Sequence, residues 1–214
     1  MPARIFDTEM TVKPIKTYSH MSQVVECNTT LGRDILNDCN EPHAKGVESM
    51  FYFISRSAID FGKSKREGHT ITEILLTGGK RGYKIKNPST EVPAITVTDT
   101  NPSIDTAFDK VLPVVLLADS PENAAAIMAL KQDKYVCIYE NTEKGADGSQ
   151  AFPVIGWENG ATGRDLTLDK SSDTGGGWAG NITETGAPTS QLFFFKTDYS
   201  TTKAALESLC SNQE

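Results

Sequence analysis

The sequence predicts a mainly β fold of the α+β class, an antiparallel β-sandwich or barrel with one or two short flanking helices. Three observations predict this class. About seven to nine short runs have the alternation or apolar density of strands, turn residues recur about every ten positions, and only two segments have helical spacing. A parallel α/β sheet would need a longer series of alternating helices than this sequence contains.

The length of 214 residues suits one sizeable domain. Residues 1–22 show no sustained period of 2 or 3.6, and we predict an extended N-terminal arm there. Residues 23–214 are predicted to form a single sandwich or barrel domain. A turn-rich stretch from Cys27 to Gly46 leads into the apolar segment 47–61, which has the composition of a strand or a bent pair of strands.

The next elements are predicted from glycines and alternation. The run ITEILLTGGKRGYKIK contains two strand-like segments joined by Gly78 and Gly79, which predicts a long hairpin at about 62–87. The segment AITVTD alternates as a strand does, and 108–119 is almost continuously apolar. We therefore expect a buried strand over 108–119, with Pro113 limiting its pairing on one edge.

The clearest helix follows this strand. Ser120 is a good N-cap, Pro121 takes the first helical position, and the apolar spacing ends near 131–134. The runs KYVCIYEN and AFPVIGW flank the turn residues GADGSQ, so 135–157 should form a hairpin.

The C-terminal third is predicted to contain further strands and one more helix. DLTLD, NIT and QLFFFKTD have strand character and are separated by glycine-rich or polar segments. A short helix should begin after a cap at Asp198 or Ser200, with Ala205, Leu206 and Leu209 on one face.

Charge and composition exclude several function classes. The net charge of −7 argues against a chain that wraps nucleic acid or lies on an anionic membrane. The sequence has no apolar run of membrane-spanning length and no apolar stretch of the kind that a secretory signal needs, so we expect no membrane association. Four cysteines are too few for a disulfide scaffold, and we expect reduced thiols in a cytoplasm.

Few residues have the pattern of a catalytic or metal site. The sequence contains three histidines and none of the motifs HExxH, GxSxG, GxGxxG or CxxC, so we expect no enzyme, no catalytic residues and no cofactor. A weak zinc candidate exists in one loop-like stretch: His20, Cys27, Cys39 and His43. The spacing lacks the close ligand pair typical of structural zinc, which leaves a Cys27–Cys39 disulfide or simple packing of these cysteines as alternatives.

Aromatic residues offer a second weak candidate. Trp157 and Trp178 could form a platform for a sugar, as in a carbohydrate-binding β-sandwich. Aromatic side chains in β proteins belong mostly to the core, and this is the interpretation that we favour for both.

The distribution of charge is the strongest signal. Seven basic residues stand between positions 63 and 86 against Glu67 and Glu73, which makes this segment +5 and leaves −12 for the rest of the chain. These residues are the candidate oligomer interface: Lys63, Lys65, Arg66, Lys80, Arg81, Lys84 and Lys86. A basic segment on an acidic body can dock on the acidic face of an identical neighbour. The alternative is a solvated, lysine-rich loop.

The order of elements carries a family resemblance. A series of segments follows from Cys27 to Leu209: the loop CNTTLGRDILNDCN, the strand GVESMFYFISRSAIDF, the basic segment, and then a strand, a helix and a strand. The sequences PVIGWENG and APTSQLFFFK come after them. This pattern resembles the tail tube proteins of bacteriophages. It is most similar to virion structural proteins of phages and prophages from Bacteroidetes.

The resemblance implies a structural protein of the virion tail, assembled in the cytoplasm of the bacterial host. In that family six copies form a ring whose hairpins join around a lumen, and the rings stack into a tube through which DNA passes. The partners would be copies of this chain and other tail proteins, with no specific DNA binding and no catalytic residues. Other virion proteins, such as a tail terminator, collar or head-decoration protein, are the alternative, together with the carbohydrate-binding sandwich and a small metal-dependent enzyme.

Within this picture each segment has an expected place. We expect the acidic arms near 140–143 and 165–169 to face the lumen, because an acidic lining repels phosphates and lets DNA slide. The basic hairpin at 62–87 would make the contact between rings, and the N-terminal arm would exchange with a neighbour.

Overall fold

The computed structural model describes residues 46–87, 95–99, 107–116, 119–168, 170 and 177–211. The chain divides into two units, Met1–Glu41 and Pro42–Glu214, and every described residue belongs to the second. The predicted N-terminal arm therefore lies outside the described residues.

The described residues form eleven strands, two α-helices and one 3-10 turn, which confirms the mainly β, α+β class. Their bounds are β1 (Val47–Ser55), the 3-10 turn η1 (Arg56–Ala58), β2 (Lys65–Glu67), β3 (Thr70–Glu73), β4 (Tyr83–Lys86), β5 (Thr96–Asp99), β6 (Phe108–Leu116), α1 (Pro121–Gln132), β7 (Tyr135–Asn141), β8 (Pro153–Ile155), β9 (Thr162–Leu168), β10 (Trp178–Ala187), β11 (Leu192–Phe194) and α2 (Tyr199–Cys210).

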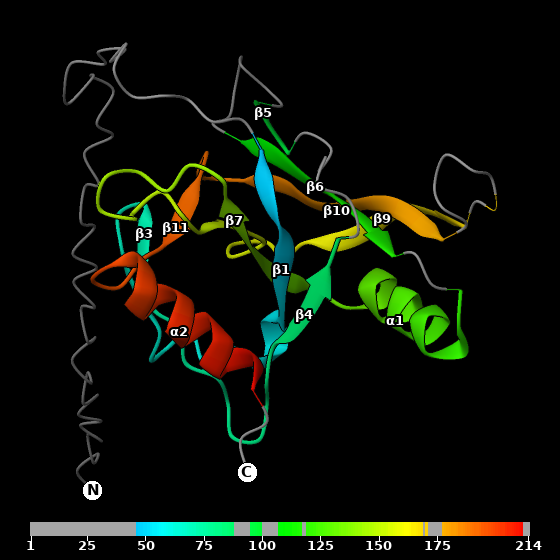
Figure 1. Ribbon diagram of the computed structural model, residues 1–214, viewed down its shortest axis with the longest axis horizontal. Coiled ribbons are helices and arrows are strands. Elements are labelled where there is room, and N and C mark those ends of the chain that lie inside the picture. Colours follow the sequence, from blue (N-terminus) through cyan, green and yellow to red (C-terminus); the bar gives the residue numbers. More distant parts are fainter. Residues whose placement is uncertain are drawn as a thin grey trace, which may run out of the picture. The chain divides into compact units, whose positions relative to one another are not determined.

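The strands make two sheets (Figure 1). The larger has the order β2-β3-β11-β8-β7-β1-β4, and the smaller has the order β5-β6-β10-β9. All of their pairings are antiparallel except the one between β11 and β3. Helix α2 packs on one face of the larger sheet, whereas the smaller sheet and α1 share a core with its other face.

Strand β1 shows how these layers are held together. Tyr52 and Ile54 point into the cluster that contains Leu206 of α2. Phe51 and Phe53 point the opposite way, into the cluster that also contains residues of β6, β10 and α1. Because successive side chains of a strand alternate between faces, a central strand buried on both sides must be apolar at almost every position. This explains the dense apolar run that marked this segment in the sequence.

The predictions of the two helices and of the hairpin over 135–157 are confirmed. The Ser120 hydroxyl accepts a hydrogen bond from the Asn123 N–H, and Pro121 begins α1. At α2 the cap is Asp198, whose carboxylate accepts from the Thr201 N–H. Strands β7 and β8 pair antiparallel, with Cys137 opposite Ile155.

The predicted hairpin at 62–87 is wrong. Its two strand-like runs became β3 and β4, which lie in different parts of the larger sheet: β3 pairs with β2 and β11, and β4 pairs with β1 at the far edge. The chain does turn at the glycines, where the Lys80 N–H donates to the Thr77 carbonyl, but the two runs do not pair with each other. Past the turn, the Gly82 N–H donates to the Leu209 carbonyl of α2. The hairpin that forms here is the short β2–β3 pair.

The strand predicted over 108–119 is also less buried than expected. In β6 only Lys110, Leu112 and Val114 are buried, while the intervening side chains are half-exposed. Lys110 is neutralised by Glu184 of β10, at 3.3 Å between Nζ and Oε2. The Glu184 carboxylate also accepts the N–H groups of Gly156, Glu158 and Asn159, which fastens the turn after β8 to the smaller sheet.

Candidate functional site

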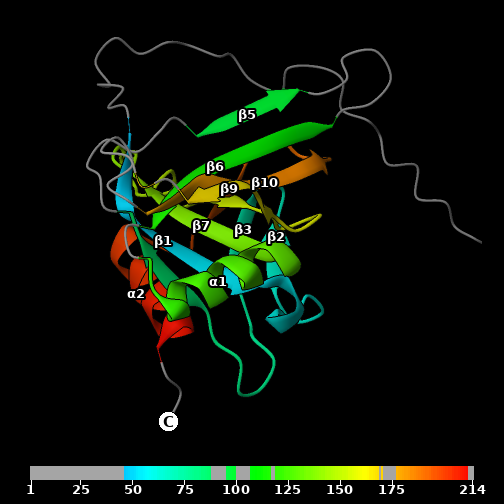
Figure 2. The same cartoon turned by 90° about the vertical axis from the view of Figure 1, so that its right-hand side faces the viewer.

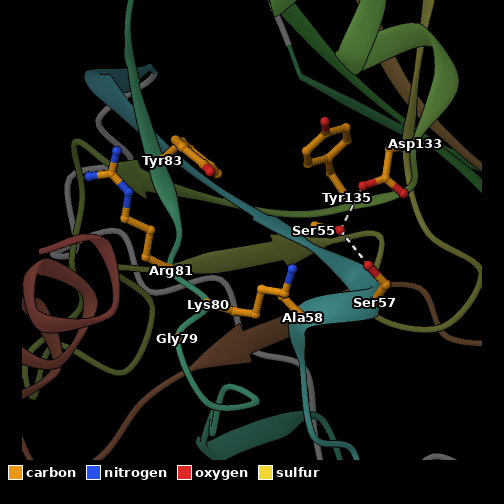
Figure 3. A pocket seen from close by; sticks show the side chains of 9 residues that line it. All are labelled: Ser55, Ser57, Ala58, Gly79, Lys80, Arg81, Tyr83, Asp133 and Tyr135. Atoms are coloured by element: carbon orange, nitrogen blue, oxygen red, sulfur yellow. Dashed lines mark hydrogen bonds between the residues drawn. The ribbon is translucent and has the colours of Figure 1, made fainter. Parts of the chain in front are cut away.

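Two adjoining cavities lie beside β4, the edge strand of the larger sheet. The first, which we call the serine pocket, has a volume of about 630 Å³ and is shown in Figure 3. The second, which we call the β4 groove, has a volume of about 470 Å³ and runs between β4 and α1. Both cavities are lined by Tyr83 and Tyr135, so they lie next to each other.

The serine pocket is polar. The Ser55 hydroxyl donates to Asp133 Oδ2 at 2.6 Å, and the hydroxyl oxygens of Ser55 and Ser57 lie 2.9 Å apart. Because the single proton of Ser55 is used on Asp133, Ser57 must donate to Ser55. In Figure 3 the amino group of Lys80 points toward the serines, whereas the Arg81 guanidinium points to the other side. The pocket can thus offer both donors and acceptors.

The β4 groove is mostly apolar. Tyr83 and Ile85 stand opposite Phe53 and Phe51 of β1, which turns them toward the α1 side of the sheet. Tyr83 is 53% exposed. The lining also includes Lys84 and Lys86 of β4, together with Phe53, Asn123 and Tyr135. The remaining walls are short or apolar side chains from α1 and β6: Leu116, Ala126, Ala129 and Leu130. Small alanines on the helix leave open space next to the strand edge.

The other face of β4 is basic. Lys84 and Lys86 stand opposite Tyr52 and Met50, which places them on the α2 side. Lys84 forms an ion pair with Glu207 of α2. Strand β4 therefore presents an apolar face, a basic face and an outer edge that no other strand of the described residues pairs with.

The seven predicted interface residues do not form one group. Lys63, Lys65 and Arg66 lie around β2, at the opposite edge of the larger sheet from β4. They pair with carboxylates of the same chain, namely Asp60 at 3.2 Å, Glu73 at 2.8 Å and Glu158 at 2.6 Å, respectively. Lys80, Arg81, Lys84 and Lys86 lie on or next to β4. The second group is the one that adjoins the cavities.

The lumen prediction for 140–143 fails at Glu140, whereas Thr142 is exposed and Glu143 is half-buried. Glu140 is only 3% exposed, since its carboxylate accepts hydrogen bonds from the Tyr199 hydroxyl at 2.6 Å and Lys203 Nζ at 3.1 Å. It holds α2 against β7 and cannot line a channel. Asp165 is exposed, in agreement with a surface role, and Asp169 lies outside the described residues.

The tryptophan platform is also ruled out. Trp157 is 8% exposed and packs edge-on against Phe61, in the cluster on the α2 side of the larger sheet. Trp178 packs against the cluster on the other side. Since the larger sheet separates them, these two rings cannot stack on one ligand.

The zinc candidates His20, Cys27, Cys39 and His43 lie outside the described residues. Within the described ranges no group of three or more His, Cys, Asp and Glu side chains could hold a metal ion. Cys137 and Cys210 are free thiols, and burial raises the pKa of both. Cys27 and Cys39 lie outside the described residues. No helix of the described part is both long and apolar enough to span a membrane.

Comparison with known proteins found no matching family model, no similar curated protein and no similar solved structure. The β4 groove was not predicted from the sequence. The run AAAIMAL is the part of the sequence that could have indicated it, because a helix with alanines on its outward side leaves space that larger residues would fill.

Proposed function

We propose that this chain is a self-assembling structural subunit of the phage tail-tube type, which forms rings that stack into a channel for DNA. The observation that carries the proposal is a pair of exposed edge strands, β4 and β5. In the described part of the chain the larger sheet ends in β2 and β4, and the smaller sheet ends in β5 and β9. An open edge invites pairing with another chain unless it is blocked.

Both edges have the side chains of an interface. All four residues of β5 are exposed, including Val97 at 39%. Thr96, Val97 and Thr98 are β-branched residues, which favour strand pairing. On β4 the exposed Tyr83 ring borders an apolar groove. Pairing between copies would cover these two edges, which would otherwise be templates for uncontrolled aggregation.

The charge suits a channel that DNA crosses without binding. Each copy contributes −7, and tight nucleic-acid binding needs clustered cations that release counterions from phosphates. A net acidic assembly keeps phosphates from adhering. This supports DNA passage and not DNA storage or recognition.

Negative-stain electron microscopy and light scattering at rising protein concentration test the proposal. We expect rings or striated tubes from the wild type, and fewer of them from Tyr83→Lys and Val97→Lys, which put a charge on each edge. Met128→Lys is the matched control, because Met128 is a similarly exposed apolar residue (52%) on α1 that lines neither the serine pocket nor the β4 groove. A chain that stays monomeric at millimolar concentration contradicts the proposal, and closed rings that never stack would favour another virion component.

A further inference from the structure

We propose that the β4 groove receives strand β5 of a second copy, so that subunits join head to tail. This inference rests on the proposed function and assigns the two surfaces that make its contact. The receptor is the space between β4 and α1, and the donor is the exposed four-residue strand Thr96–Asp99.

The groove has the three features that a strand receptor needs. The outer edge of β4 offers main-chain donors and acceptors over four residues, the same length as β5. The apolar wall of Ile85, Leu116 and Leu130 would bury side chains of an incoming strand. Ala126 and Ala129 let that strand approach α1 closely. Added strands of this kind gain affinity from main-chain hydrogen bonds and specificity from side-chain pockets.

Strand β5 has the features of a donor. It pairs with β6, from Thr96 opposite Val111 to Asp99 opposite Phe108, and no other strand of the described residues pairs with its second edge. Val97 and Asp99 share one face of the strand, and Thr96 and Thr98 share the other. When β5 docks with the face of Val97 and Asp99 toward Lys84 and Lys86, its other face, with the two small threonines, points toward the alanines of α1.

Charge argues against the symmetric alternative, in which β4 pairs with β4 of the second copy. Such a pair would bring Lys84 and Lys86 close to the same lysines of the partner, and like charges across paired strands destabilise the pairing. A contact between two different surfaces avoids this repulsion.

The positions of the two surfaces allow such a contact to repeat. Strand β5 lies at the top of both Figure 1 and Figure 2, beyond β6, whereas α1 lies below it in both views, with β4 beside α1 in Figure 1. A docked copy thus keeps its own groove accessible for the next copy. Head-to-tail contacts between different surfaces generate closed rings or open filaments.

Two blocked variants test this pairing. Ala126→Trp should fill the groove, and Thr96→Lys with Thr98→Lys should block the donor strand; all three positions are exposed, so the fold should tolerate them. Each variant alone should raise the critical concentration for assembly by on the order of tenfold or more. An equimolar mixture should form 1:1 dimers that do not grow. In such a dimer the intact groove of the threonine variant holds the intact β5 of the Ala126→Trp variant. The groove and the β5 strand that remain outside this contact are the two blocked ones, so no third copy can join. Ala125→Trp, at an exposed alanine that does not line the groove, is the control and should assemble as the wild type does.

The outcomes separate the two proposals. If the wild type never assembles, the proposed function fails. If the wild type assembles and either blocked variant assembles equally well, or if the mixture yields no dimers by light scattering, the β4–β5 pairing is wrong while the proposed function stands. Circular dichroism checks the fold of each variant, and Ala129→Trp replaces Ala126→Trp if that variant does not fold.

Discussion

At the scale of single residues, Glu140 carries the attachment of the C-terminal helix. Burial opposes its charge, but hydrogen bonds from Tyr199 and Lys203, with the nearby Lys144 charge, outweigh burial and lower the pKa of this carboxyl. Lys203 also donates to the Tyr199 hydroxyl, at 2.9 Å. The carboxylate is thus held in its charged form by partners from α2 and from the end of β7.

Glu140→Gln should lower the free energy of unfolding at pH 7 by about 1–2 kcal/mol, since it removes charge-assisted hydrogen bonds. The pKa of Glu140 is lowered in the folded chain, so its contribution is complete above the ordinary value of 4.5 and is lost as the pH falls through the folded-state value. The difference between wild type and variant should therefore shrink in acid. Urea unfolding at pH 7 and about pH 3 measures this, with the exposed Glu67→Gln as control. A difference that is independent of pH would contradict it.

The error over Glu140 has a physical cause. Alternation in a strand shows which residues share a face, but the Glu140 partners lie 59 and 63 positions later in the chain. Nothing local marks an acidic residue that a distant tyrosine and lysine will neutralise. The capping residues were predictable for the opposite reason, because Ser120 and Asp198 bond to N–H groups three residues away.

At the scale of elements, β4 depends on α2. A side chain at Gly82 would lie 2.8 Å from Cys210 Sγ and 3.3 Å from the Phe53 carbonyl, so this position allows no Cβ without displacement of its neighbours. The close approach lets the Gly82 N–H reach Leu209. This contact explains why the predicted hairpin failed: the strand-like runs were found in the sequence, but a packing contact with a helix more than 120 residues later chose their partners.

Gly82→Ala should destabilise the chain by about 1–3 kcal/mol, the usual range for overpacking a filled site. It should also loosen β4 more than the rest of the sheet, because the contact is made at the residue before this strand. Hydrogen exchange resolved by residue, together with urea unfolding, measures both effects. Gly78→Ala is the control, since a side chain there would meet nothing within 4 Å and its backbone does not need a positive φ. Equal stability of the two variants would show that the space at Gly82 is not tight.

At the scale of the whole molecule, the charge asymmetry read from the sequence becomes two separate surfaces. The three cations around β2 are neutralised within the chain by Asp60, Glu73 and Glu158. Of the four on or next to β4, Lys80 and Arg81 line the serine pocket, and Lys84 and Lys86 lie on the strand itself, with Glu207 of α2 as the partner of Lys84. The sequence showed how many charges stand between positions 63 and 86, but their division between two sheet edges depends on strand order, which long-range pairing decides.

This division predicts which cations assembly needs. Reversal of Lys84 and Lys86 to glutamate should raise the critical concentration for assembly by on the order of tenfold, because the basic face of β4 would then repel the acidic remainder of a second copy. Reversal of Lys63 and Lys65 changes the net charge equally but at the opposite edge of the larger sheet, away from β4, so it should have a much smaller effect. Added salt should weaken wild-type assembly in parallel, since the screening length falls from about 8 Å at 0.15 M to about 3 Å at 1 M. Light scattering against sodium chloride concentration measures both effects. Assembly that strengthens with salt, or that responds equally to the two reversals, would mean that the contact is apolar and that the charge of β4 does not direct it.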